Sequence, residues 1–243
     1  MLEFAQRSNE EEWMDDLQME GPELAKTLDQ LSLINNWLGG AGPSVNGVAQ
    51  LIKRSTQAEY TIADIGSGAG DTLRAIAKWG RKQNIKLNLI GFDANAYCVE
   101  YAQQMAKDYP EIRFEQADCF AERFYQQEFD IVHCGLFLHH FTDEQLLKML
   151  PRFCQMAQLG LVVNDLHRSK IAYFLFQIVC TIFRSSAMVR HDGLVSIKRS
   201  FTRQDLKQIL PLSPFIHTEI NWRWAFRYQM ILDTRTYRQI PAI

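Results

Sequence analysis

The sequence lacks the features that mark nucleic-acid-binding and metal-binding proteins. Its 26 lysines and arginines are balanced by 28 acids, and they form no basic stripe of the kind that contacts phosphates. We therefore expect no DNA or RNA partner. The five cysteines make no C-x-x-C pair and no metal-ligand spacing, which predicts buried thiols in a reducing compartment and no metal site.

Leader and membrane-spanning patterns are also missing. The N-terminal segment is acidic over Glu10–Asp16, which is wrong for a signal peptide. The longest apolar run, residues 171–183, is shorter than the roughly 20 residues that cross a bilayer. We expect a cytoplasmic protein with one main core, no membrane span, and a solvated face at the acidic run.

The most informative segment that is present is Tyr60–Asp71, in which a β-branched run ends at Asp64 and three alternate glycines follow. A strand, a glycine turn and a predicted helix over 72–82 place a ligand at the carboxyl edge of a parallel sheet. The spacing is G-x-G-x-G, and Asp71 stands where the dinucleotide fingerprint needs a third glycine. An acid there would compete with a pyrophosphate for the helix N-terminus. The pattern favours S-adenosylmethionine, with Asp64 placed to accept from its ammonium group.

Two further predicted strands end near acids that suit an adenosine. Residues 87–93 end at Asp93, which is placed to accept the ribose hydroxyls. The segment 112–120 gives a third strand whose end carries Asp118, followed by Phe120. The acid can accept from the adenine amino group, and the ring can pack on the base. The segment 128–141 supplies a fourth strand, with Cys134 and Gly135 after it, and residues 160–165 form a fifth.

In this order the motifs resemble those of the class I S-adenosylmethionine-dependent methyltransferases. The resemblance spans roughly residues 60–165 and rests on Asp64–Gly70, Gly91–Asp93, Gln116–Asp118 and Phe129–Phe141. It implies a doubly wound, mostly parallel seven-stranded α/β sheet. It also implies a helical cap over 1–45 and a methyltransferase domain over 46–243, with a helical lid inserted at about 168–200. The cofactor contacts that the sequence and the resemblance predict are Asp64, Gly66, Ser67, Gly68, Gly70, Asp93, Ala94, Asp118, Cys119, Phe120, Cys134 and Gly135.

Three regions lie outside these motifs. A helix is predicted over 22–38, between Pro22 and the glycines that end it. The run 171–183 is predicted to be a lid helix that is apolar on all sides, which favours burial against the core, a second copy in a homodimer, or a greasy acceptor pocket. The cations that flank it make a membrane-surface helix an alternative. Residues 215–224 and 226–232 predict a closing hairpin.

Methyl transfer to a hydroxyl needs an aligned acceptor and, for a phenol or enol, a base near neutral pH. Histidine suits this task. We place His167 first, because it follows strand five on the acceptor side, and His140 second. Asp165 can orient a histidine or accept the proton itself.

The sequence therefore predicts a methyltransferase of secondary metabolism acting on a small apolar or aromatic hydroxyl compound, such as a phenol, enol or polyketide-like acceptor. The string Leu138–Phe141 is similar to the branch that methylates quinones and polyketides. C-methylation of a similar ring and a non-catalytic S-adenosylmethionine-binding protein are the alternatives. A dehydrogenase would need the glycine that Asp71 replaces. A protein methyltransferase would need an acidic groove for lysine or arginine side chains, and the sequence shows no such groove.

Overall fold

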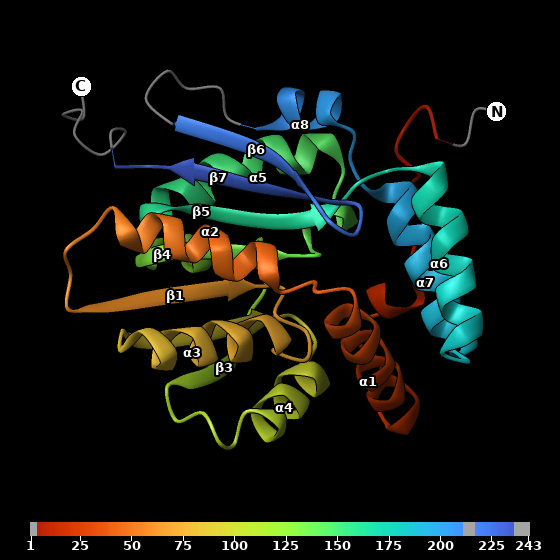
Figure 1. The fold of residues 1–243 in the computed structure, drawn as a ribbon, viewed down its shortest axis with the longest axis horizontal. Helices are drawn as coiled ribbons and strands as arrows, with labels where there is room; N and C mark the ends of the chain where they lie inside the picture. The colour runs from red at the N-terminus through yellow and green to blue at the C-terminus, as the bar shows by residue number, and fades with distance from the viewer. Residues whose placement is uncertain (1–3, 211–216, 236–243) are drawn as a thin grey trace.

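The computed structural model describes residues 4–210 and 217–235, which include a seven-stranded sheet with the order β3-β2-β1-β4-β5-β7-β6 (Figure 1). Neighbouring strands from β3 to β5 are parallel, and β7 is antiparallel to both β5 and β6. This confirms the predicted fold class. The strands are β1 Glu59–Ile65, β2 Lys86–Asp93, β3 Ile112–Gln116, β4 Phe129–Gly135, β5 Ala157–Leu166, β6 His217–Arg223 and β7 Arg227–Asp233.

Helices cover both faces of the sheet because the central strands are apolar on both sides. On one face, α2 Gly42–Lys53, α3 Asp71–Gln83 and α4 Ala96–Met105 share one buried cluster with β1 and β2. On the other face, α5 Asp143–Met156 and α8 Arg203–Ile209 pack over β4, β5 and β7. The short 3-10 turns η2 Glu122–Gln126 and η3 Leu138–His140 lie between strands and helices of this second face. The sheet thus presents only its carboxyl edge to a ligand.

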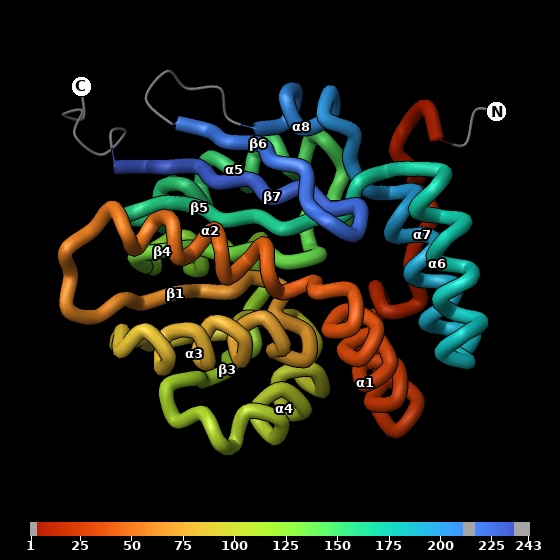
Figure 2. The backbone as a smooth tube through the Cα atoms, viewed as in Figure 1, coloured from red at the N-terminus to blue at the C-terminus, as the bar shows by residue number. Residues whose placement is uncertain are grey.

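A helical cap lies beside that carboxyl edge (Figure 2). It consists of α1 Pro22–Trp37, α6 Lys170–Ile182, α7 Ala187–Arg199 and the 3-10 turn η1 Trp13–Asp15. The helices predicted over 22–38 and in the lid are confirmed, whereas α7 was missed. Its segment contains polar and charged residues on several sides, so no apolar stripe marks it as a helix.

In the described single chain, the lid helix α6 is covered on one side only, so burial in the chain's own core, one of the arrangements expected from the sequence, is incomplete. Only Ala172 and Cys180 of its residues are buried. An apolar stripe is exposed to solvent and consists of Ile171, Phe174, Leu175, Ile178 and Ile182. The opposite side packs closely on α7, where a side chain at Gly193 would overlap the ring of Phe176.

The acidic N-terminal run is in part the solvated face that the sequence predicted, because Glu10, Glu11 and Asp16 are exposed, whereas Glu12 and Asp15 are not. Glu12 is buried at 7% exposure, because its segment lies against α7. The carboxylate of Asp192 on α7 accepts hydrogen bonds from the backbone nitrogens of Trp13 (2.8 Å) and Met14 (3.1 Å). The ring of Trp13 stacks on His191, with 4.4 Å between the ring centroids. These contacts bring N-terminal acids to the edge of the sheet.

The closing hairpin is confirmed as β6 and β7, although residues 215 and 216 of the predicted first strand lie outside the described residues. A capping box formed by Thr202 and Asp205 begins α8. Within the described part of the chain, no helix has the length and apolar character needed to cross a membrane.

Candidate active site

A cavity of about 1840 Å³ opens at the carboxyl edge of the parallel strands. Its walls come from the glycine loop, the ends of β2, β4 and β5, and the cap elements η1, α1, α6 and α7. Ligand pockets commonly measure roughly 300–1,000 Å³. This cavity therefore has room for a nucleoside cofactor and a second molecule.

The glycine loop after β1 forms one wall of this cavity. Gly66 and Gly68 both have positive φ angles, +73° and +49°, which glycine adopts without strain. A side chain at Gly66 would overlap the ring of Phe137, whereas a Cβ at Gly68 would meet no atom within 4 Å. The Oγ of Ser67 is buried and has no hydrogen-bond partner among the residues that the structure describes. The loop thus leaves open space and a spare polar atom beside the cavity.

Asp93, at the end of β2, lies beside this loop. One carboxylate oxygen accepts from the backbone nitrogen of Gly68 (2.9 Å), and the other accepts from that of Asn95 (3.0 Å). Burial raises the pKa of Asp93, which means that its charged form gains from further donors. A pair of ribose hydroxyls would supply such donors.

The predicted adenine contacts follow β3. Asp118 and Cys119 line the cavity, and Asp118 Oδ1 accepts from the backbone nitrogen of Phe120 (2.8 Å). Phe120 packs edge-on against Phe141, which in turn packs against Phe137, with centroid distances of 5.4 and 4.8 Å. This aromatic row provides an apolar surface for a flat base.

Three predicted cofactor contacts do not line the cavity. Asp64 is buried and bonds to Nδ1 of His133 at 2.6 Å, so the structure does not place it to hold an ammonium group. Gly70 turns toward the ring of Phe114, and Cys134 is fully buried in the core. The remaining predicted contacts are cavity residues, namely Gly66, Ser67, Gly68, Asp93, Ala94, Asp118, Cys119, Phe120 and Gly135.

Asp165 is also corrected as a direct proton acceptor. It is fully buried, and its two oxygens accept from the backbone nitrogens of Leu138, His139 and Leu166. Its Oδ1 also lies 2.7 Å from Nδ1 of His139. The histidine that Asp165 contacts is His139.

His139 is a buried cation at the base of the cavity. Burial lowers its pKa, but the charge and hydrogen bond of Asp165, together with Glu12, outweigh this effect and raise the pKa to about 9. The Nε2 of His139 lies 3.5 Å from Oε1 of Glu12. Burial alone would raise the pKa of Glu12, yet the two histidines hold it below its usual value. His139 and Glu12 therefore form a charged pair.

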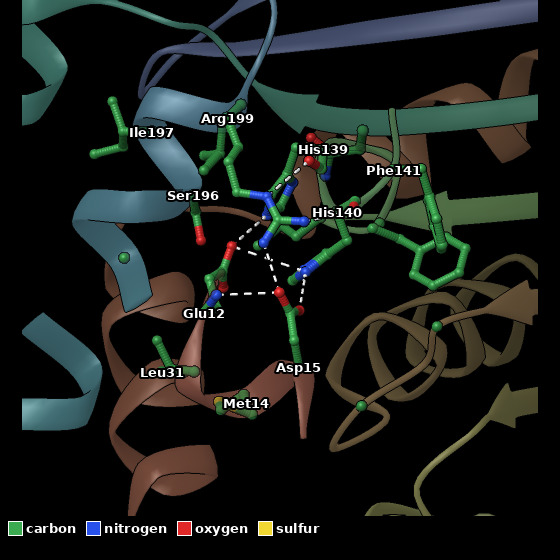
Figure 3. Close-up of a pocket in the computed structure, with 18 of the residues that line it drawn as sticks. Glu12, Met14, Asp15, Leu31, His139, His140, Phe141, Ser196, Ile197 and Arg199 are labelled. Atoms are coloured by element: carbon green, nitrogen blue, oxygen red, sulfur yellow. Dashed lines mark hydrogen bonds and ion pairs between the residues drawn. The ribbon is translucent and has the colours of Figure 1, made fainter. Parts of the chain in front are cut away.

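His140, the second candidate base, lies next to this pair in the cavity wall (Figure 3). Its Nδ1 is 2.7 Å from Oδ1 of Asp15, whose other oxygen pairs with Nη1 of Arg199 at 2.5 Å. Among the described residues, Nε2 of His140 has no hydrogen-bond partner. With the proton of a neutral ring on Nδ1, the lone pair of Nε2 is free.

The first candidate, His167, also lines the cavity. Burial, with a smaller effect of Arg168, lowers the pKa of His167, so its ring is neutral at pH 7. The indole nitrogen of Trp222 donates to Nδ1 at 3.3 Å. A neutral ring that accepts at Nδ1 carries its proton on Nε2, which leaves no free lone pair.

The sequence reasoning missed four functional side chains, because each comes from a segment without a recognisable motif. Glu12 and Asp15 come from the acidic run, Arg199 from the unpredicted α7, and Arg227 from the first position of β7. Glu12, His139 and His140 offer possible ligand atoms within 4.8 Å of one another, so they could also hold a metal ion. The ion pairs already described satisfy the charges of this group.

Comparison with known proteins identifies a domain within the chain. Residues 62–160 match the family model described as a methyltransferase domain. This segment contains the glycine loop, Asp93, Asp118 and the two histidines of η3. Over residues 62–160, the chain therefore matches a methyltransferase domain.

A curated relative agrees with this assignment. The domain is 35% identical over 89 residues to the uncharacterized methyltransferase YcgJ of Bacillus subtilis, a match that covers 36% of this chain and 33% of the relative. The alignment thus spans a third of the relative's length, so it characterises the methyltransferase domain and not the whole chain.

Solved structures extend the likeness in fold to most of the chain. The magnesium protoporphyrin IX methyltransferase of Synechocystis PCC 6803, solved with S-adenosylhomocysteine, is 19% identical at a TM-score of 0.54, and the match covers 84% of this chain and 91% of that one. The plantazolicin methyltransferase BpumL, also solved with S-adenosylhomocysteine, is 14% identical at a TM-score of 0.61, with 86% and 93% covered. At these identities the likeness concerns the fold alone.

The methyltransferase domain fits its family's cofactor on the evidence of its own side chains. The open face of Gly68, the unpartnered Ser67 Oγ and the buried Asp93 carboxylate all border one cavity. Asp71 begins α3 and accepts from Ser32 Oγ at 2.8 Å, so a carboxylate occupies the helix N-terminus that a pyrophosphate would need. These features suit a ligand with a ribose and no phosphate.

Proposed function

We propose that the protein transfers a methyl group from S-adenosylmethionine to a hydroxyl oxygen of a small, planar and largely apolar acceptor. The observation that carries this proposal is a cavity for two molecules in which His140 borders the space left beside the cofactor residues. Aromatic and aliphatic side chains beside η3, on α6 and in the turn before β7 border the cavity, among them Phe137, Phe141, Leu175, Trp224 and Phe226. They favour a ring compound over a polar polymer or a peptide.

In this proposal, Gly68 and Ser67 hold the amino-acid side of the cofactor, Asp93 holds the ribose, and Asp118 with Phe120 holds the adenine. S-adenosylmethionine supplies an electrophilic methyl group when bound. The chain has to align the acceptor and exclude water. The inner side of α6 serves the second task, with Ala172, Phe176 and Val179 at the cavity wall.

His140 is the base that the geometry favours. Asp15 holds Nδ1–H, so Nε2 can take the proton of the acceptor hydroxyl. Arg199 holds Asp15 in place, and its Nε and Nη2 also donate to the backbone oxygens of His139 and His140. His167 would have to break its bond to Trp222 first. His167 therefore follows His140 as a candidate.

C-methylation of a phenol or enol ring is the second candidate function, because removal of the same proton makes a ring carbon nucleophilic. A non-catalytic S-adenosylmethionine binder would have no use for a histidine that is oriented by an acid and faces the acceptor space. The arrangement of Asp15 and His140 thus argues for catalysis.

The test is calorimetric titration of the purified chain with S-adenosylmethionine, S-adenosylhomocysteine and NAD. We expect binding of both sulfur ligands and none of NAD. The loaded protein is then incubated with a panel of phenols and enols, and the product is analysed by mass spectrometry and fragmentation to separate O- from C-methylation. No binding of either sulfur ligand by the folded protein would refute the proposal.

A further inference from the structure

Arg227 is a buried cation in the wall of the cavity that the proposed reaction does not use. It begins β7 and is 4% exposed. Its guanidinium makes a single hydrogen bond to the described residues, from Nη2 to Oδ1 of Asn35 at 2.6 Å. The Nε and Nη1 groups are buried and have no partner there.

A buried guanidinium with one hydrogen bond lowers the stability of the protein without a ligand. A buried charge is normally paired, because transfer of an ion out of water costs several kcal/mol unless a counter-charge and hydrogen bonds replace the water. Burial lowers the pKa of Arg227, and the charge of Asp165 opposes this to a smaller extent. The net result is a pKa of about 10. At neutral pH the guanidinium therefore remains charged.

The nearest acid cannot neutralise Arg227. Asp165 is paired across β5 and β7 with Tyr228, whereas Arg227 is paired with Leu166. Successive residues of a strand point to opposite faces, so Asp165 and Arg227 lie on opposite faces of the sheet. Asp165 is moreover fully engaged by His139 and three backbone nitrogens. The counter-charge has to come from outside the described chain.

The position of Arg227 indicates which ligand brings that charge. It lies on β7, and β4 and β5 separate this strand from β1 and its glycine loop. Three strand spacings correspond to about 14 Å, which is further than one arginine side chain extends. Among the residues that line the cavity, Asn35 contacts Arg227 directly, Gly40 lies beside its Nη2, and Leu166 is its partner on β5. None of these three belongs to the glycine loop or to the ends of β2 and β3.

We propose that the acceptor is an aromatic or apolar carboxylate and that Arg227 binds its carboxylate group. This inference rests on the proposed function, because it names the acceptor class of the same site. Guanidinium–carboxylate contacts are strong and directional. Asn35 holds one end of the guanidinium, and the unpartnered Nε and Nη1 are the donors that remain for the ligand. A carboxylate there would pair a charge that is otherwise buried alone.

The test uses 2-naphthoate and its neutral counterpart 2-naphthamide, titrated by calorimetry into protein saturated with S-adenosylhomocysteine. We expect the wild-type protein to bind the carboxylate about tenfold more tightly or better, as one charged contact implies. The Arg227→Met variant should lose this preference, and Arg227→Lys should retain part of it. Arg113→Met, which removes an exposed arginine on β3, is the matched control and should behave as wild type. Equal affinity for the two compounds in the wild-type protein would overturn the proposal, as would a preference that persists in Arg227→Met.

A second arm separates the acceptor from the cofactor as the source of the carboxylate. S-adenosylhomocysteine carries an amino-acid carboxylate, and 5′-methylthioadenosine lacks it. We expect Arg227→Met and Arg227→Lys to bind S-adenosylhomocysteine with the wild-type dissociation constant. A loss of about tenfold for this ligand alone, with unchanged binding of 5′-methylthioadenosine, would assign Arg227 to the cofactor and overturn our inference. Failure of the wild-type protein to bind S-adenosylhomocysteine would instead refute the proposed function.

Discussion

At the scale of single residues, two consecutive histidines have different surroundings and therefore different chemistry. His139 is buried between Asp165 and Glu12 and is held as a cation. His140 is partly exposed to the cavity and has a free Nε2. A cation cannot accept a proton, so only the second histidine of the pair is suited to be a base.

We expect His140→Gln to lower kcat by about two orders of magnitude or more, the usual contribution of a positioned base. The affinity for S-adenosylhomocysteine should stay unchanged, because His140 makes no predicted cofactor contact. His167→Gln is the matched comparison and should have a smaller effect on kcat. Steady-state kinetics with an identified acceptor, measured against pH, checks both variants. A larger loss in His167→Gln would restore His167 as the base.

The pair of His139 and Asp165 should make stability depend on pH. The pKa of His139 is higher in the folded state than its ordinary value of 6.5. Its contribution to stability is therefore complete below about pH 6.5 and is lost as the pH rises through about 9. Urea unfolding at several pH values between these limits should show a falling free energy of unfolding in the wild-type protein. His139→Gln should be less stable at pH 6.5, by about 2–4 kcal/mol, and should show a weaker pH dependence. Equal pH dependence of the two proteins would contradict this prediction.

At the scale of elements, the N-terminal segment is part of the active site because α7 holds it there. Asp192 accepts two backbone hydrogen bonds from η1, and Arg199 pairs with Asp15. Arg7 adds contacts to Asp143 and to the backbone oxygens of His139 and Phe141. The residue that orients the base thus depends on contacts between segments about 180 residues apart in the chain.

Asp192→Ala should release this segment. We expect faster amide hydrogen exchange over residues 5–16 and a loss of activity, since Asp15 would no longer hold His140. The free energy of unfolding should fall by about 1–3 kcal/mol. Asp108→Ala, at an exposed position after α4, is the control and should change neither quantity. Unchanged exchange at the N-terminus of Asp192→Ala would show that other contacts hold the segment.

At the scale of the whole molecule, the outer stripe of α6 is the surface that most needs explanation. Five large apolar side chains of one helix are exposed together, and Ile171 and Ile182 are more than 60% exposed. Soluble monomers rarely expose a contiguous apolar patch of this kind, and such patches often mark interaction sites. A homodimer, one of the arrangements expected from the sequence, would cover it.

We predict concentration-dependent dimers in analytical ultracentrifugation and their loss in the double variant Phe174→Glu, Ile178→Glu. Both side chains belong to the exposed stripe, so the change should leave the core intact. Leu147→Glu, an exposed leucine on α5, is the matched control and should leave the dimers intact. A wild-type protein that sediments as a monomer at all concentrations would contradict the prediction.

Local patterns were sufficient to predict the sheet and half of the site. Each strand of the parallel set is a short apolar run that ends in a turn, and the glycine loop has a spacing that only a close-packed ligand turn requires. The predicted cofactor residues follow from the same strands, because each of them lies at or shortly after the carboxyl end of a strand. Asp64 also lies near the end of a strand, but its carboxylate bonds to His133 and does not border the cavity. The two residues are neighbours only because β1 pairs with β4.

The sequence by itself determined the fold class, the cofactor class and the candidate histidines, because these depend on contacts between residues that are close in the chain or on one strand edge. Tertiary structure alone decided which histidine has a free nitrogen, which acids are engaged, and that Arg227 lies unpaired beside the cavity. Those properties depend on charge pairing and burial between distant segments, and neither has a period or spacing along the sequence. The acceptor side of the site was therefore readable only after the chain was folded.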